Sequence, residues 1–88
     1  MKITYDPAKR TKTLMERGLD FKDAARVFEG ETLDIEDDRY DYGEIRIRTF
    51  GFLNKRVVSV VWTPRKQGRR IISMRYANDR EKRAFLQL

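Results

Sequence analysis

Cysteine and histidine are both absent from the 88 residues of this sequence. Without cysteine, the chain cannot form disulfides, CxxC redox centres or thiolate metal sites. Without histidine, it lacks the usual general base and the commonest ligand of transition metals. Together the two absences exclude Ser-His-Asp hydrolases, Cys-His nucleophiles, zinc fingers and HExxH peptidases. We expect no cofactor and no bound metal.

Long apolar runs are absent as well. The longest uninterrupted ones span a few residues, so we expect no segment to cross a membrane. Residues 1–6 contain no apolar stretch of the kind found in signal peptides. The chain has only 2 prolines and 5 glycines and shows no linker. We therefore expect one small domain over residues 1–88, soluble and located in the cytoplasm.

Acidic residues are scarce in the second half of the chain. Residues 1–44 carry 8 basic and 12 acidic side chains, a net charge of −4, whereas residues 45–88 carry 12 and 2, a net charge of +10. Nine of those twelve basic residues are arginines, which bind phosphate bidentately and stack on bases. This pattern favours a nucleic-acid or acidic-protein partner. The alternative is a solvated surface that happens to be basic.

The first part of the chain has helical signals. Asp6-Pro7 is an N-cap followed by proline at the first helical position, and Gly18 is the expected stop. Leu14 is the clearest core residue of this first helix. The expected elements are an extended segment at 2–5, a helix at 8–17 and a shorter helix that Asp20 caps and Gly30 ends.

After residue 31 the period changes from helical to two. The expected strands are an acid-rich edge strand at 32–38, then 44–52, 56–63 and 69–76. Pro64 is expected to end the third of these, and alternation in the last places Ile72 and Met74 on one face and Ile71, Ser73 and Arg75 on the other. Asn78-x-x-Glu81 is a capping box that starts a final helix.

The order of elements is therefore β-α-α-β-β-β-β-α. Helices followed by a strand meander predict an α+β fold with an antiparallel sheet of about four to five strands. Two helices precede the meander and one follows it, and we expect the helices to cover one face of the sheet.

Polar residues alternate along two of the expected strands. Glu44, Arg46 and Arg48 share one side of their strand, and Arg69 and Arg75 can share a side with Ser73. If those faces coincide, guanidiniums converge around a carboxylate. Such a group can stabilise the pentavalent transition state of phosphodiester cleavage and take a proton from a 2′-hydroxyl, so a nuclease of this kind is metal-independent and confined to RNA. The alternative is a solvated face with cross-strand ion pairs.

Three further features each allow two interpretations. The basic turn at 65–70 suits phosphate positioning or a solubilising hairpin tip. Aromatic residues on the strands suit base stacking or, more commonly, the core; they are Trp62, Phe50, Phe52 and Tyr76. The acidic segment 34–41 lacks the spacing of a calcium loop and suits a solvated edge or a docking surface.

Several short segments follow one another in a characteristic order. They are Asp6-x-x-Lys9, Gly18-Leu19-Asp20-Phe21, Ala24-Ala25-Arg26-Val27-Phe28, Gly43-Glu44-x-Arg46, Val60-Val61-x-Thr63-x-Arg65, Arg70-Ile71-Ile72-Ser73-x-Arg75 and Glu81-x-x-x-Phe85. Their order and spacing strongly resemble the BrnT toxins of bacterial toxin–antitoxin pairs over essentially the whole chain. The resemblance implies a RelE-like α+β fold and a small ribonuclease that cleaves RNA and arrests growth. It also implies a BrnA-type antitoxin, typically a ribbon-helix-helix protein, and operator binding only through that antitoxin.

The functional surface of the family falls on the end of the first helix and on the strands. Carried over position by position, it comprises Arg17, Glu44, Arg46, Arg65, Ser73 and Arg75. At the end of the first helix Arg17 either points a guanidinium across the sheet or offsets the helix dipole. Basic residues expected to contact the nucleic acid beside this surface are Arg48, Lys66, Arg69 and Arg70.

Two positions depart from the family pattern. Members commonly have Lys-His-Gly at the end of the first helix, where this chain has Glu16-Arg17-Gly18. Arginine keeps the positive charge but does not exchange a proton at neutral pH, so the proton acceptor is left open. Phe85 stands where tyrosine is frequent, which removes a phenol. Three functions fit: an endoribonuclease toxin, a catalytically weakened homologue that binds its antitoxin or RNA, or a purely structural partner subunit.

Overall fold

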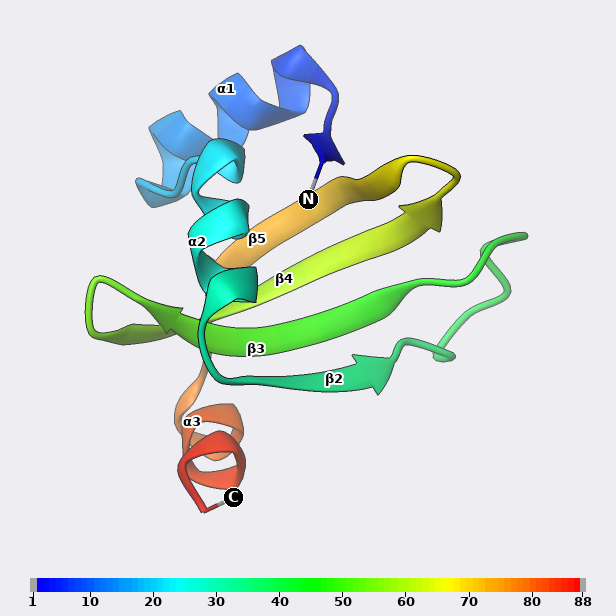
Figure 1. Ribbon diagram of the computed structural model, residues 1–88. Coiled ribbons are helices and arrows are strands. Elements are labelled where there is room, and N and C mark those ends of the chain that lie inside the picture. Colours follow the sequence, from blue (N-terminus) through cyan, green and yellow to red (C-terminus); the bar gives the residue numbers. More distant parts are fainter. Residues whose placement is uncertain (1, 88) are drawn as a thin grey trace.

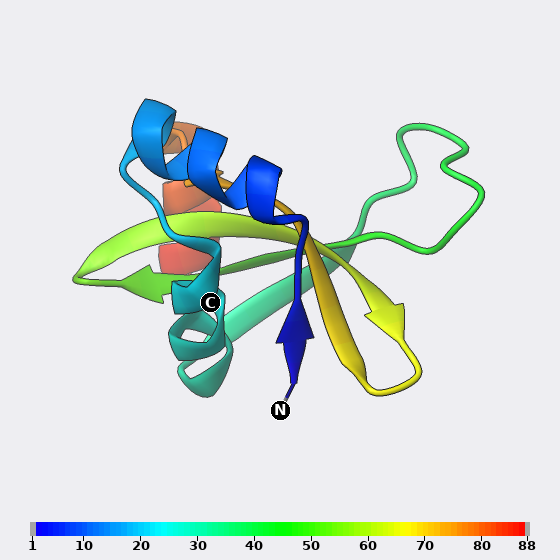
Figure 2. The same ribbon diagram turned by 90° about the horizontal axis from the view of Figure 1, so that it is seen from above.

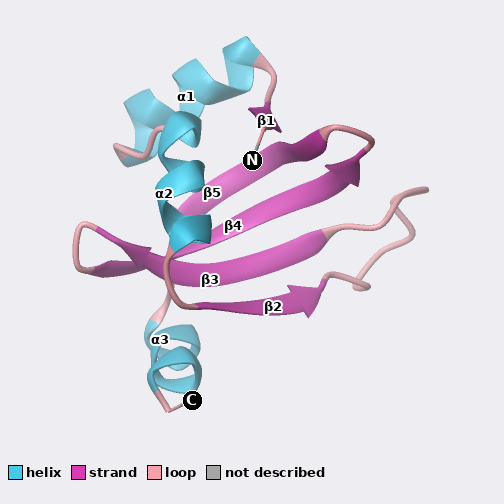
Figure 3. Ribbon diagram, viewed as in Figure 1, coloured by secondary structure: helices cyan, strands magenta, loops and turns pink. Residues whose placement is uncertain are grey.

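A five-stranded sheet with helices on both faces forms the structure, a computed structural model that describes residues 2–87 (Figure 1). Figure 3 separates helices from strands. The elements are β1 (Ile3–Thr4), α1 (Pro7–Arg17), a short turn of 3₁₀ helix (Phe21–Asp23), α2 (Ala24–Glu29), β2 (Thr32–Glu36), β3 (Ile47–Leu53), β4 (Arg56–Arg65), β5 (Gly68–Tyr76) and α3 (Asp79–Leu86). The α+β class and the predicted order of elements are confirmed.

The strand order in the sheet is β1-β5-β4-β3-β2. The pairs among β2, β3, β4 and β5 are antiparallel, as predicted, but β1 runs parallel to β5. The backbone N–H of Arg69 donates to the Lys2 carbonyl at 2.9 Å and extends this pairing. The sheet is therefore mixed, because the first strand is joined to the meander by helices and is free to pair in either direction.

Local signals set the helix ends as the sequence predicts. The Asp6 side chain accepts a hydrogen bond from the backbone N–H of Ala8 at 2.9 Å at the start of α1. Gly18 ends that helix with a φ of 69°, a left-handed conformation that glycine adopts without steric cost. Asn78 and Glu81 form the predicted capping box at the start of α3.

Helix α1 differs from the prediction in its packing. It buries none of its residues, and Leu14, the expected core residue, is 41% exposed. Figure 2, seen from above, shows α1 beside β5 and not across the middle of the sheet. Polar contacts hold it there: Arg10 forms a bidentate ion pair with Asp20, with distances of 2.8 and 2.9 Å.

The two faces of the sheet carry separate cores, which corrects the prediction that the helices cover one face. Ten buried residues pack on the α2 face: Leu19, Phe21, Ala24, Val27, Leu53, Val58, Val60, Trp62, Ile71 and Met74. Four pack on the opposite face, under α3: Phe50, Val57, Ala77 and Phe85. Gly51 allows α2 to approach β3, because a Cβ there would lie 2.8 Å from Cγ1 of Val27.

A bulge in β5 changes which side chains share a face. Val61 pairs with Ser73 but Trp62 pairs with Ile71, so Ile72 is an extra residue. Ile71 and Met74 are consequently buried in the same core, where alternation had placed them on opposite faces. Ser73 and Arg75 lie on the α3 face.

Two strand ends also differ from the prediction. Strand β4 continues through Pro64 to Arg65, since β3 pairs with it only as far as Trp62 and leaves that edge free for a proline. Strand β3 begins at Ile47, so Glu44 and Arg46 lie in the loop between β2 and β3.

Candidate functional site

Arg75 and Glu81 form a bidentate ion pair on the α3 face of the sheet. Arg75 on β5 donates through Nη1 and Nη2 to the two carboxylate oxygens of Glu81, at 2.7 and 2.8 Å. The Glu81 side chain is 16% exposed and also accepts from the backbone N–H of Asn78 at 3.0 Å. Hydrogen bonding from Arg75 lowers the pKa of Glu81 to about 2, against the effect of burial. Both groups are therefore charged at neutral pH.

Arg48 lies near this pair on the same face. It pairs across strands with Val61, which in turn pairs with Ser73. Arg48 contributes to the lowered pKa of Glu81, and its buried Nε has no hydrogen-bond partner within residues 2–87. We call Arg48, Arg75 and Glu81 the Glu81 cluster.

A second orphaned polar atom lies beside the cluster. Ser59 on β4 pairs directly with Arg75, and its buried Oγ also has no partner in the described part of the chain. Hydrogen bonding to Glu81 raises the pKa of Arg75, and the positive charge of Arg39, in the loop between β2 and β3, acts against this rise. Arginine fork geometry fits phosphate as it fits carboxylate, so the cluster has the donors needed to hold a phosphodiester.

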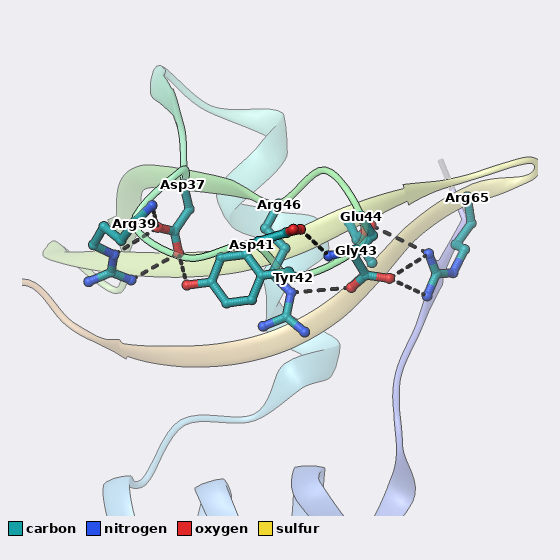
Figure 4. Close-up of polar contacts among 9 residues, drawn as sticks. Asp37, Arg39, Asp41, Tyr42, Gly43, Glu44, Arg46 and Arg65 are labelled. Carbon is teal, nitrogen blue, oxygen red and sulfur yellow. Dashed lines mark hydrogen bonds and ion pairs between the residues drawn. The ribbon is translucent and has the colours of Figure 1, made fainter.

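The conformation of the loop between β2 and β3 depends on a buried carboxylate, that of Asp37, which is only 4% exposed (Figure 4). It accepts from Arg39 Nε at 2.7 Å and Nη2 at 2.9 Å and from the Tyr42 hydroxyl at 3.2 Å. Hydrogen bonding from Arg39 lowers the pKa of Asp37 to about 2.

Glu44, Arg46 and Arg65 form a second group, the Glu44 cluster (Figure 4). The Glu44 carboxylate lies between the two guanidiniums, 3.2 Å from Arg46 Nε and 3.4 Å from Arg65 Nη2. Hydrogen bonding from Arg46, with the charge of Arg65, lowers its pKa. The Arg46 guanidinium also stacks on the Tyr42 ring, 4.1 Å from its centroid.

The two clusters adjoin where Arg46 precedes Arg48 by two residues, but Arg75 and Arg65 lie far apart along the sheet. Arg75 of β5 pairs with Ser59 of β4. Arg65 lies six residues further along β4 than Ser59 and pairs with Gly68 at the hairpin. At the usual rise of a strand, that separation is about 20 Å. The sequence predicted one convergent group of arginines around Glu44. The structure instead divides these residues between two carboxylates.

Arg17 contacts β5 at Met74, the residue before Arg75 of the Glu81 cluster. Its Nη1 donates to the Met74 carbonyl of β5 at 2.8 Å. Arg17 and Ser73 line a cavity of about 300 Å³ together with Lys9 and Lys12 of α1. The guanidinium therefore reaches the backbone of β5 next to Ser73 and does not cross the sheet.

Arg69 lies on the other face from Arg75, which corrects the expectation that they share one. Its guanidinium stacks on Phe28 and Trp62, 4.3 Å from each ring centroid, on the α2 face. A cavity of about 400 Å³ at the tip of the β4–β5 hairpin is lined by its neighbours Lys66 and Arg70, with Arg65, Lys2 and Thr4.

The aromatic residues mostly serve the core, as the more common interpretation holds. Phe50 and Trp62 are buried, and Trp62 Nε1 donates to the Thr49 hydroxyl at 2.7 Å. Phe52 packs edge-on against Phe85, with 5.2 Å between ring centroids. Tyr76 lies under the Arg56 guanidinium, 3.7 Å away. Phe52 nevertheless stays 44% exposed, so it is the one of these four rings that lies open at the surface.

Sequence reasoning missed Glu81, Arg39 and Ser59 as site residues. Glu81 matched the capping box, which accounts for its backbone contact but not for its bidentate contact with Arg75. Arg39 lies in the acidic segment 34–41, which suggested a solvated edge or a docking surface and not an RNA site. Their positions depend on how the 37–46 loop and α3 fold onto the sheet, which no local pattern encodes.

Comparison with known protein families identifies the family to which the chain belongs. The family described as "Ribonuclease toxin, BrnT, of type II toxin-antitoxin system" matches residues 5–81, a span that holds every candidate residue from Arg17 to Glu81. The chain belongs to the BrnT family. The members of this family are ribonuclease toxins of type II toxin–antitoxin systems. A search of curated proteins gave no match.

Two further observations concern ligands and membranes. Within residues 2–87, no three acidic side chains gather in a way that could hold a metal ion. No helix in the same range has the length and apolar character needed to cross a bilayer.

Proposed function

We propose that this BrnT-family chain is a metal-independent endoribonuclease toxin that cleaves RNA through attack of the 2′-hydroxyl on the adjacent phosphate. The observation that carries the proposal is the Glu81 cluster: two arginines, one with a buried and unpartnered Nε, beside a carboxylate on one face of the sheet. Pentavalent phosphorus carries extra negative charge, and pre-positioned guanidiniums stabilise it.

Each arginine has a distinct part in this proposal. Arg75 and Arg48 hold the reacting phosphate, and Arg39 adds to the positive field around it. Arg17 and Ser73, at the cavity between α1 and β5, contact the neighbouring nucleotide. The Glu44 cluster and the hairpin residues Lys66 and Arg70, at the far end of the sheet, bind the sugar–phosphate backbone of the same strand.

Arg69 also lines the hairpin cavity with Lys66 and Arg70 and belongs to the proposed RNA-binding surface, but it has a second role in supporting the hairpin. Both of its neighbouring rings are already in contact with it. Replacement of Arg69 is therefore expected to lower stability, whereas replacement of Lys66 is expected to weaken RNA binding alone.

The antitoxin proposed for this chain is a BrnA-like ribbon-helix-helix protein. Its neutralising segment covers basic residues of the second half of the chain through acidic or apolar side chains, and operator DNA is bound only through it. Such a pair acts in the cytoplasm of a bacterium. Charge reversal at Arg65, on the exposed hairpin, is expected to weaken the toxin–antitoxin complex.

Induced expression in a bacterial host tests the function. Wild-type protein is expected to arrest growth and degrade total RNA, and Arg75→Ala is expected to do neither. Arg80→Ala, a change of an exposed arginine on α3, serves as the matched control and should keep the toxicity. Normal growth with folded wild-type protein would contradict the proposal.

A second function is favoured by one observation, the presence of Arg17 where the family commonly has histidine. A toxin homologue without a proton-transfer group would bind RNA or its antitoxin without cutting. RNA retention that falls steeply with salt, with no cleavage products, would identify this function, because phosphate contacts release counterions.

A further inference from the structure

We infer that the Glu81 carboxylate takes the proton from the attacking 2′-hydroxyl, and that the RNA phosphate frees it for this role by taking its place on Arg75. The inference rests on the proposed ribonuclease function and adds the identity of the proton acceptor. From the sequence that acceptor stays open, with a glutamate near an arginine or solvent as the candidates.

The chemistry of the chain leaves few alternatives. The chain has no histidine, and ammonium and guanidinium groups are hydrogen-bond donors without an acceptor site. Asp37 is buried under Arg39 and Tyr42 and holds the loop between β2 and β3. Glu44 accepts from Arg46 and Arg65, and Arg65 lies about 20 Å along the sheet from Arg75. Glu81 contacts Arg75, the guanidinium proposed to hold the reacting phosphate.

The geometry makes Glu81 and a phosphate competitors for the same donors. The Nη1 and Nη2 atoms of Arg75 present two parallel hydrogen bonds, which fit a carboxylate or a phosphate equally well. Arg48 lies close enough to act on Glu81 and has a free buried Nε. A phosphate that accepts from both arginines would lie directly beside the Glu81 carboxylate.

Displacement by phosphate also improves Glu81 as a base. Arg75 is the main reason for its low pKa, with smaller contributions from the Asn78 N–H and the charge of Arg48. Once Arg75 donates to the phosphate instead, Glu81 loses that hydrogen bond. The pKa of Glu81 then rises towards the usual value for glutamate, about 4.3. The Asn78 N–H still holds the side chain in place, so the carboxylate is ionised, positioned and more basic.

The step balances as an internal transesterification. The 2′-O–H bond breaks and its proton passes to Glu81 while the 2′-oxygen bonds to phosphorus. The bond from phosphorus to the 5′-oxygen breaks, and that oxygen takes a proton from water. The products are a 2′,3′-cyclic phosphate and a 5′-hydroxyl, and the hydroxide left in solution recovers the proton from Glu81.

Glu81→Gln separates this role from a structural one, because glutamine also suits the third position of a capping box. With a short oligoribonucleotide as substrate, kcat is expected to fall about 10²- to 10⁴-fold, the usual contribution of a general base. RNA affinity, measured with the same sequence carrying 2′-deoxyribose, is expected to stay the same or rise, because Arg75 loses its carboxylate partner. Asp79→Asn, on the same helix turn, serves as the control and should cut with near-normal kcat.

Each outcome decides between the alternatives. Cleavage by Glu81→Gln at or above the wild-type rate would show that Glu81 only blocks Arg75 and would overturn the inference. Absence of cleavage by the wild type would contradict the proposed function itself. A second test needs only the wild-type protein: kcat should rise with pH over about pH 4 to 6 as Glu81 in the RNA complex ionises. A flat profile there would also overturn the inference.

Discussion

The guanidinium of Arg75 and the carboxylate of Glu81 face each other in parallel, joined by hydrogen bonds of 2.7 and 2.8 Å. This contact fastens the first turn of α3 to β5, and it lies beside the unpartnered Nε of Arg48. One ion pair therefore belongs both to the packing of a helix and to the proposed phosphate site. Variants at these positions need a stability measurement beside every activity measurement.

Arg48→Met should reduce RNA cleavage without destabilising the fold. The buried Nε of Arg48 makes no hydrogen bond, so its removal leaves no partner unsatisfied among the described residues. The free energy of unfolding is expected to stay the same or rise, whereas kcat is expected to fall about 10²- to 10³-fold with the loss of a transition-state donor. Arg56→Met, which removes a guanidinium stacked on Tyr76, is the control and should retain activity. Undiminished cleavage by Arg48→Met would remove Arg48 from the site.

Thr49→Val should destabilise the core on the α2 side. The Thr49 hydroxyl accepts from Trp62 Nε1 at 2.7 Å and donates to Asp34 at 2.6 Å. Valine has the same shape but leaves the buried indole N–H without an acceptor, which costs about 1–3 kcal/mol of unfolding free energy. Asp34→Asn keeps an acceptor for the hydroxyl and should cost less. Urea denaturation of the two variants compares these losses directly.

Gly51→Ala should disturb the contact between α2 and β3. A Cβ at this position would meet Cγ1 of Val27 at 2.8 Å, so the helix must move or strain its side chains. Overpacking of this kind costs about 1–3 kcal/mol. Gly30→Ala, where the nearest atom to a new Cβ is 3.9 Å away, provides the comparison and should be close to neutral. Equal stability of the two variants would show that α2 does not need a glycine at Gly51.

Asp37 should make the stability of the protein depend on pH in the acid range. Its pKa is lowered to about 2 in the folded state, below the value of about 3.9 expected when unfolded. The carboxylate therefore contributes stability above about pH 4, and this contribution is lost as the pH falls towards 2. Asp37→Asn should be less stable than wild type at pH 7 and should lose less stability on acidification. Asp38→Asn, a change of the exposed neighbour, controls for the removed charge.

The sequence predicts the parts of this fold that depend on neighbouring residues. Asp6, Gly18 and Asn78 set helix ends through contacts within a turn, and each is where the sequence places it. Strand periodicity likewise locates β3, β4 and β5 to within a few residues. The register between strands cannot be predicted in this way. Ile72 is an extra residue because of how β5 pairs with β4, and alternation along β5 alone does not reveal this bulge.

The candidate site was predictable only in part for the same reason. Arginine-rich strands indicated a phosphate-binding surface, and Arg75 and Arg48 do share a face. The division into two clusters follows from the loop that Asp37 anchors and from α3, which brings Glu81 onto the sheet. Both are contacts between elements, so composition and spacing predicted that arginines share a face of the sheet but not which carboxylate they contact.

The most direct test of the account is cleavage of RNA by the purified protein in excess chelator, with the ends of the products identified. The account predicts cleavage that the chelator does not reduce, 2′,3′-cyclic phosphate and 5′-hydroxyl ends, and loss of both with Arg75→Ala. Cleavage that requires a divalent ion, or products with a 5′-phosphate, would contradict it.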